Sequence, residues 1–120
     1  MSHSPLLQLA RESIEEVLQA HYKIDKTKLL EQYPLLNEKV PVSIKIFLQD
    51  ELRGFYTTKG AELSLVESIA IGAKKAAFED KAHKALTLSE YFLCYIEISL
   101  ETESGVISHK ERAFLENRSS

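Results

Sequence analysis

The single cysteine, Cys94, is the first candidate for covalent chemistry, because a thiolate is a strong nucleophile when a nearby base activates it. Apolar and polar residues alternate along the segment from Leu93 to Glu101. This period of two places Cys94 on the same face of a strand as Ile96, Ile98 and Leu100. We therefore predict a buried and inert thiol, since free cysteine is among the most buried residue types.

The other residue types that carry chemistry do not fall into a known pattern. The four histidines lie far apart, and no pair has the short spacing of a zinc or iron site: His3, His21, His83 and His109. The four glycines do not form a phosphate-binding loop, and no serine has the context of a nucleophile elbow. The sequence predicts no metal site, no cofactor and no identifiable catalytic group.

One segment, Leu52 to Thr58, combines residues that can bind a ligand. Gly54 interrupts a run that favours a strand, and a glycine there marks a bulge or the close approach of another group. Arg53 could bind an anion, while Phe55 and Tyr56 could line a cleft. The alternative is a solvated arginine beside aromatic rings that pack on the helices.

A small-ligand site in this segment would use a cleft along Arg53 to Thr57. Arg53 would contact an anionic group, and Tyr56 or Thr57 would donate hydrogen bonds. The candidate site residues are therefore Arg53, Gly54, Tyr56 and Thr57.

The first half of the chain supplies a helix and then a hairpin. Apolar residues recur every three or four positions from Pro5 to about Tyr22, which predicts an amphipathic helix. Its polar face is expected to lie in solvent and carries Glu12, Glu15, Glu16 and Gln19. Asp25 can cap a short helix that ends at Tyr33, before Pro34.

Strict alternation from Val40 to Leu48 predicts a strand with one wholly apolar face, and the run from Leu52 to Thr58 is the second strand of an antiparallel hairpin. The intervening turn, Gln49-Asp50-Glu51, lacks the glycine that two-residue hairpin turns prefer.

The second half resumes with a helix from Ser64 to about Asp80, where Ser64 and Glu67 have the spacing of a capping box. Gly72 within this helix suggests close packing against a sheet. Thr87 can cap one further turn, and the strand of Leu93 to Glu101 follows. A helix is predicted for 109–117. The order of elements fits an α+β fold with a mostly antiparallel sheet flanked by helices.

Composition bounds the class of protein. The chain has 120 residues, 44% of them hydrophobic, which suits one domain over residues 1–120, with 106–120 the least defined part. No segment has the roughly 20 apolar residues of a membrane span, and the start of the chain lacks the features of a secretion signal. The lone cysteine suits a reducing compartment. We therefore expect a cytoplasmic protein. A net charge of −3 does not favour nucleic acid, and acidic residues interrupt the best basic cluster, Lys74, Lys75, Lys81 and Lys84.

Several segments, taken in order, resemble a known family. They are Glu51-Leu52-Arg53-Gly54, then Ala76-Ala77-Phe78-Glu79-Asp80, then Leu86-Thr87-Leu88-Ser89-Glu90 and Ile96-Glu97-Ile98-Ser99. Together with the opening helix they are similar to the AMMECR family domain from about residue 6 to 101. The resemblance implies an α+β fold with an antiparallel sheet. It also implies an association with Memo-like and radical SAM proteins, which suggests a component of an uncharacterised modification system.

The chain departs from the family signature L-R-G-C-I-G, because Phe55, Tyr56 and Thr57 stand where cysteine, isoleucine and glycine would. Thiol chemistry at that position is therefore not carried over, and Cys94 does not substitute for it. The family domain normally continues further, so we expect a short, divergent member.

Two hypotheses follow. The first is an accessory domain that works through contact with a protein partner or a second copy of itself. The second is an enzyme or small-ligand binder that uses the cleft along Arg53 to Thr57.

Overall fold

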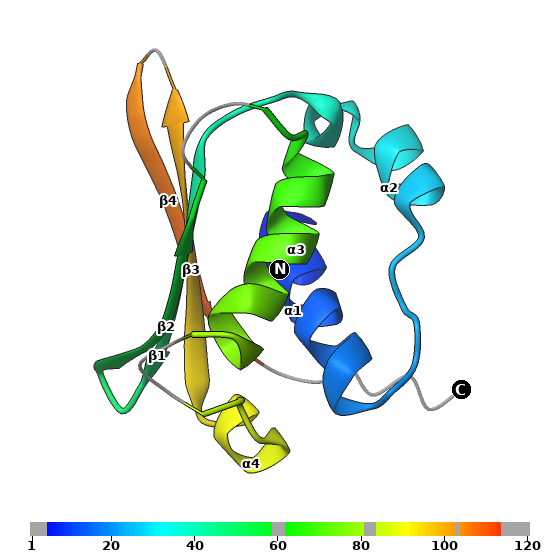
Figure 1. Cartoon of the computed structure of the whole chain (residues 1–120). Coiled ribbons are helices and arrows are strands. Elements are labelled where there is room, and N and C mark those ends of the chain that lie inside the picture. The colour runs from blue at the N-terminus through cyan, green and yellow to red at the C-terminus, as the bar shows by residue number, and fades with distance from the viewer. Residues whose placement is uncertain (1–4, 59–61, 81–83, 103, 114–120) are drawn as a thin grey trace.

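Four antiparallel strands pair in the order β2-β1-β3-β4 to form one sheet (Figure 1). The computed structural model describes residues 5–58, 62–80, 84–102 and 104–113. In chain order the strands are β1 (Val42–Leu48), β2 (Glu51–Thr57), β3 (Cys94–Thr102) and β4 (Gly105–Arg112). The sheet thus consists of two hairpins that meet where β1 pairs with β3.

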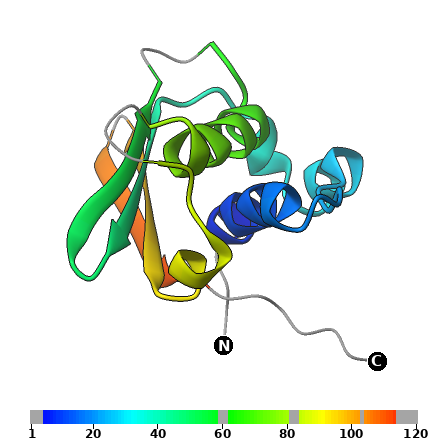
Figure 2. The same ribbon diagram turned by 60° about the horizontal axis from the view of Figure 1, so that its bottom comes forward.

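The helices in the described part of the chain lie to one side of this sheet (Figures 1 and 2). They are α1 (Pro5–Leu18), α2 (Lys26–Gln32), α3 (Leu65–Phe78) and α4 (Leu88–Tyr91), with a 3-10 helix η1 at Pro34–Asn37. Helices α1 and α3 pack against each other and cover the inner face of the sheet. No described element covers the opposite face, which we call the outer face.

The core lies between the sheet and helices α1 and α3. On the two central strands the buried side chains are those that alternation predicts: Val42, Ile44 and Ile46 of β1, and Cys94, Ile96, Ile98 and Leu100 of β3. They meet buried apolar residues of both helices, among them Leu9, Ile14, Ile69 and Ala73. The predicted α+β fold with an antiparallel sheet is confirmed.

Helix caps follow the sequence in two cases out of three. Asp25 accepts a hydrogen bond from the Lys28 backbone at the start of α2. Thr87 and Glu90 form a reciprocal capping box on α4. The capping box predicted at Ser64 is wrong, because the Ser64 hydroxyl donates to the Glu67 carboxylate at 3.1 Å and accepts no backbone hydrogen bond.

The hairpin between β1 and β2 turns without a glycine. Gln49 has a φ of 53° and Asp50 a φ of 66°, so both lie in the left-handed region. Two such residues in succession are the backbone of a type I′ turn, which matches the twist of the flanking strands. Aspartate tolerates this conformation better than most side chains do, and glutamine has no such preference.

The end of the chain is a strand where a helix was predicted for 109–117. Residues 105–112 form β4 and pair with β3 over their whole length, so the helix is wrong for 109–112, and 114–117 lie outside the described residues. Most side chains of this edge strand are exposed, so it lacks the apolar alternation that identifies a half-buried strand.

Candidate functional site

The predicted site begins on the edge strand β2, where the pairing with β1 is irregular. Ile46 pairs with Gly54, but its neighbour Phe47 pairs with Leu52, so Arg53 is an extra residue in β2. Such a bulge locally bends a strand and redirects its side chains. Here it allows Leu52 and Phe55 to lie on the same outer face, while Arg53 is buried with only 8% of its surface exposed.

Arg53 is not solvated: its side chain is buried, with Nη2 and Nε in hydrogen bonds and with Nη1 buried without one. Its Nη2 atom donates to the Lys84 carbonyl at 2.6 Å and lies 3.3 Å from Oε1 of Glu90. Its Nε atom donates to the other Glu90 oxygen at 3.4 Å. The hydrogen bond from the Thr87 backbone, together with Arg53 and against the effect of burial, holds the pKa of Glu90 below its ordinary value. Arg53 thus fastens the start of α4 to the bulge of β2.

Gly54 faces the last turns of α3. A Cβ atom built at Gly54 would lie 2.0 Å from the carbonyl oxygen of Ala76, far inside van der Waals contact. A Cβ atom at Gly72 would likewise meet the Tyr56 ring at 2.5 Å. The two glycines therefore let helix and strand approach each other closely, as the sequence predicted for Gly72.

The four predicted site residues point in different directions. Arg53 turns toward α4, Gly54 lies beneath α3, and the half-buried Tyr56 packs against the same helix. Thr57 is exposed on the outer face, where its hydroxyl lies 3.1 Å from that of Ser43. Of these four residues only Tyr56 lines an open depression of about 400 Å³, together with Phe55, Lys75, Glu79 and Asp80.

Cys94 is buried at the start of β3, as predicted. Its Sγ atom donates to the Tyr91 carbonyl at 3.3 Å. Burial raises the pKa of the Cys94 thiol to about 11, so the thiol is protonated at neutral pH. Among the described residues no cluster of histidine, cysteine and carboxylate side chains could hold a metal ion.

Helix α1 carries a buried polar network that no local pattern in the sequence indicates. Glu15 and Glu16, which were predicted to lie in solvent, are both buried. Oε2 of Glu15 accepts from the Tyr91 hydroxyl at 2.5 Å, and its Oε1 lies 2.9 Å from Lys23 Nζ. Burial and the Glu15 carboxylate raise the pKa of Tyr91, so this phenol remains a hydrogen-bond donor.

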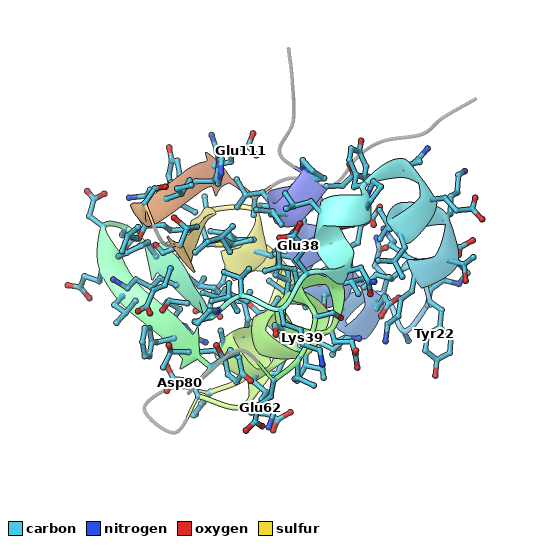
Figure 3. The ribbon with its side chains drawn as sticks, turned by 90° about the horizontal axis from the view of Figure 1, so that it is seen from above. Tyr22, Glu38, Lys39, Glu62, Asp80 and Glu111 are labelled. Carbon is cyan, nitrogen blue, oxygen red and sulfur yellow. The ribbon has the colours of Figure 1, made fainter. Side chains whose placement is uncertain are left out.

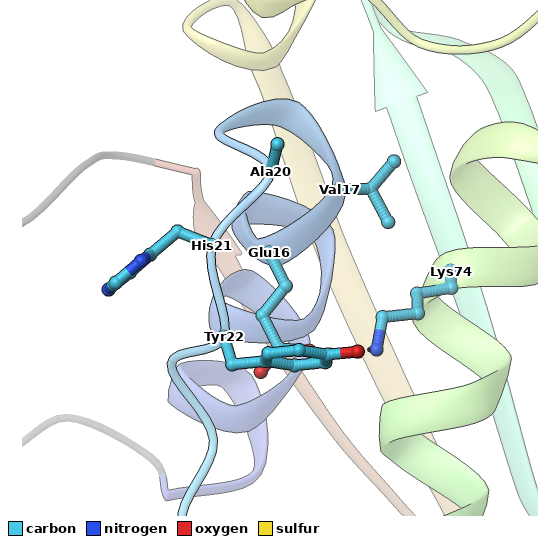
Figure 4. A pocket seen from close by; sticks show the side chains of 6 residues that line it. All are labelled: Glu16, Val17, Ala20, His21, Tyr22 and Lys74. Carbon is cyan, nitrogen blue, oxygen red and sulfur yellow. Dashed lines mark hydrogen bonds and ion pairs between the residues drawn. The ribbon is translucent and has the colours of Figure 1, made fainter.

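Glu16 lines a second pocket, of about 380 Å³, to which α1 contributes Val17 and α3 contributes Lys74 (Figure 4). Lys74 reaches from α3 to within 2.8 Å of Glu16 Oε1, and the backbone amides of Lys23 and Ile24 donate to Oε2 at 2.8 Å. Burial raises the pKa of Glu16, but these hydrogen bonds outweigh it and hold the pKa below its ordinary value. The charges of Glu16 and Lys74 in the pocket lining are thus paired with each other.

The rim of this pocket is exposed. Tyr22, 91% exposed, projects from the surface in Figure 3, and His21 lies beside it along the chain. The lining of the pocket therefore combines a paired Glu16 and Lys74 with the exposed side chains of His21 and Tyr22.

The outer face of the sheet is the other candidate surface. Strand register places Leu52, Phe47 and Tyr95 side by side across three strands, and Phe55 is the next outward residue of β2. Phe55 and Tyr95 are 43% and 44% exposed. The Lys110 Nζ atom lies 4.5 Å from the centre of the Phe47 ring and 5.8 Å from that of Tyr95. These residues form an uncovered patch of apolar rings that carries a cation.

Comparison with known proteins identifies the fold. The sequence profile of the AMMECR1 family matches residues 7–117, which is nearly the whole chain. The chain belongs to the AMMECR1 family. Among solved structures it is similar to the uncharacterised protein PH0010 of Pyrococcus horikoshii, with 28% sequence identity and a TM-score of 0.70. The match covers 79% of this chain and 48% of PH0010, so this AMMECR1 chain corresponds to about half of that protein.

The search of curated proteins found no match. None of the helices in the described ranges is long and apolar enough to cross a membrane. Within this AMMECR1 chain, Phe55 occupies the position at which the family resemblance expects a cysteine, and it lies on the exposed outer face.

Proposed function

We propose that this AMMECR1-family chain is an accessory component that binds a protein partner and catalyses no reaction itself. The family resemblance suggests that the partner belongs to a modification system with Memo-like and radical SAM proteins. Domain 1–120 would act as one cytoplasmic unit, and homodimerisation remains a further prediction.

The outer face of the sheet is the observation that carries this proposal. An antiparallel sheet normally packs one face on the core, and its opposite face is polar where no other element covers it. Here Leu52, Phe55 and Tyr95 each leave more than two-fifths of their surface exposed on the same face. Neighbouring exposed apolar side chains of this kind mark interaction sites.

The two side chains best suited to chemistry, those of Arg53 and Cys94, support the same proposal because both are buried in the fold. Arg53 is buried against Glu90 and the Lys84 carbonyl. The Cys94 thiol is buried and protonated, since its pKa is about 11. A nucleophile or an anion site would need such groups to be accessible.

Affinity capture from an extract of the native cells tests this function. The wild-type chain is expected to retain a defined partner, and Phe55→Ser together with Tyr95→Ser is expected to abolish retention. Tyr22→Ser is the matched control, because Tyr22 is an exposed aromatic residue away from the sheet. Equal retention by the outer-face variant, or turnover of a small molecule by the isolated chain, would contradict the proposal.

A small-ligand binder is the second candidate, and the depression beside Tyr56 favours it. This depression of about 400 Å³ brings Phe55 and Tyr56 of β2 together with Lys75 of α3. Since Arg53 is buried, Lys75 would meet an anionic group of a ligand there, and the carboxylates of Glu79 and Asp80 would meet a cationic group. A metabolite screen by thermal shift tests it: a true ligand should lose its stabilising effect in Lys75→Ala and Tyr56→Phe but not in Lys26→Ala.

A further inference from the structure

The side chains of the outer face form three rows across the four strands. Reading from β2 to β4, the first row is Leu52, Phe47, Tyr95 and Arg112. The second row is Phe55, Lys45, Glu97 and Lys110. The third row is Thr57, Ser43, Ser99 and Ser108. Apolar rings thus gather toward β2, and cations gather toward β4.

The charge of these rows differs in sign from that of the whole chain. The three rows hold three cations, Lys45, Lys110 and Arg112, and one carboxylate, Glu97. Glu101 of β3 adds a second carboxylate beyond these rows on the same face, so the face keeps an excess of one positive charge. The chain as a whole has a net charge of −3. A surface with a local excess of positive charge attracts a partner of opposite charge and repels a copy of itself. The outer face therefore favours an acidic partner over face-to-face pairing of two identical chains.

The position of Lys110 discriminates between classes of acidic partner. Its ammonium group lies over the Phe47 ring at 4.5 Å and near the Tyr95 ring at 5.8 Å. Single-stranded nucleic acid binds such sheets by stacking bases on ring faces, and here the cation would have to leave first. A carboxylate can instead approach Lys110 from solvent while the rings and Leu52 contact apolar side chains.

Resting on the proposed function, we infer that the outer face docks an acidic segment of a protein partner that also carries apolar or aromatic side chains. Carboxylates of the segment pair with Lys110, Arg112 and Lys45. Its apolar side chains pack on Phe55, Leu52 and Tyr95, where exposed surface leaves water on binding. The hydroxyl row beside them offers further hydrogen bonds.

A synthetic polymer provides a probe that needs no knowledge of the natural partner. A random copolymer of glutamate and tyrosine should bind the intact chain and shift the amide resonances of all four strands, β2 included, in two-dimensional NMR spectra. Polyglutamate should bind at least tenfold more weakly, since it lacks apolar groups. A copolymer of lysine and tyrosine should not bind. Higher salt should weaken the interaction, because part of it is between exposed charges.

The variant Lys110→Gln with Arg112→Gln should reduce affinity for the glutamate–tyrosine copolymer at least tenfold. The matched control is Lys26→Gln with Lys28→Gln, which removes the same charge from α2. Phe55→Ser is a second variant, and it should weaken binding of the copolymer more than binding of polyglutamate. Equal affinity of the control and the outer-face variant would overturn the inference.

Three further results would also overturn it. Tighter binding of a uridine oligonucleotide than of the copolymer would assign the face to nucleic acid. A dimer in light scattering that Phe55→Ser converts to a monomer would assign it to a second copy. A captured cellular partner that the copolymer fails to displace would end this inference and leave the proposed function standing, whereas absence of any captured partner would end the proposed function itself.

Discussion

Gly54 of β2 and Ala76 of α3 lie in such close contact that a Cβ atom at Gly54 would come within 2.0 Å of the Ala76 carbonyl oxygen. The obstacle is backbone, so it cannot rotate away as a side chain can. The close approach of this strand and helix therefore depends on the absence of a side chain at Gly54.

Gly54→Ala should lower the free energy of unfolding by about 3 kcal/mol, because helix α3 must move outward to admit a methyl group. Gly72→Ala should lower it by about 1 kcal/mol or less. There the new Cβ meets the Tyr56 and Ile44 side chains, which can shift, and alanine favours the helix. Urea unfolding of both variants measures the difference, and equal losses would show that the Ala76 contact is not decisive.

Arg53→Ala should lower the free energy of unfolding by about 2 kcal/mol, because the hydrogen bond to the Lys84 carbonyl and the Glu90 pair are both lost. Arg53→Lys should recover little, since one ammonium group cannot reproduce the guanidinium fork. Arg112→Ala, at an exposed arginine, is the control and should change stability by less than about 0.5 kcal/mol. Wild-type stability in Arg53→Ala would mean that the α4 connection is dispensable.

Glu16→Gln should lower the free energy of unfolding at pH 7 by about 2 kcal/mol, because the carboxylate serves two backbone amides and Lys74. The folded-state pKa of Glu16 is below its ordinary value of 4.5, so its stabilising effect is complete above that value and is lost as the pH falls through the folded-state pKa. Wild type and variant should therefore converge in acid. Glu31→Gln, at an exposed carboxylate of α2, is the control and should change stability at pH 7 by less than about 0.5 kcal/mol.

Cys94 should resist alkylation in the native chain. With a pKa of about 11, its thiolate fraction at pH 8 is roughly a hundredfold or more below that of an unfolded thiol. Iodoacetamide should react slowly in buffer and rapidly in urea, as followed by mass spectrometry. Comparable rates in both solvents would show that the start of β3 opens readily.

Asp50→Gly should raise the free energy of unfolding by roughly 0.5–1 kcal/mol, because glycine adopts the left-handed conformation of this turn without steric cost. Asp50→Ala should lower it, since alanine lacks the freedom of glycine and adopts the left-handed region less readily than aspartate does. Thermal unfolding of the two variants gives the sign of each change.

The parts of the fold that depend on neighbouring residues could be predicted from the sequence. Alternation from Val42 to Leu48 and from Cys94 to Leu100 records the inner face directly, because a strand turns every second side chain to the same side. The caps at Asp25 and Thr87 are likewise local. The burial of Cys94 follows from its place in that alternation.

The parts of the fold that depend on residues distant in the chain could not be predicted from the sequence. Glu16 pairs with Lys74, 58 positions away along the chain, and nothing within α1 signals that contact. Arg53 binds Glu90, which lies 37 positions further along the chain. Its nearness in sequence to Tyr56 and Thr57 predicts a shared cleft, but Arg53 does not line the depression that Tyr56 lines. The rows of the outer face can be derived only when the strand order is known. That order includes β4, whose mostly exposed side chains lack the alternation by which a strand is predicted.

The meeting of two hairpins at the centre of the sheet sets the order in which the chain can fold. The β1–β2 and β3–β4 pairs are local, whereas Ile46 finds Ile96 only after about fifty residues of chain have closed into a loop. Contacts of such long sequence separation slow folding. We therefore expect pairing of β1 with β3 to limit the folding rate. In stopped-flow measurements, Ile96→Val should slow refolding, whereas Val106→Ala at the far edge should chiefly speed unfolding.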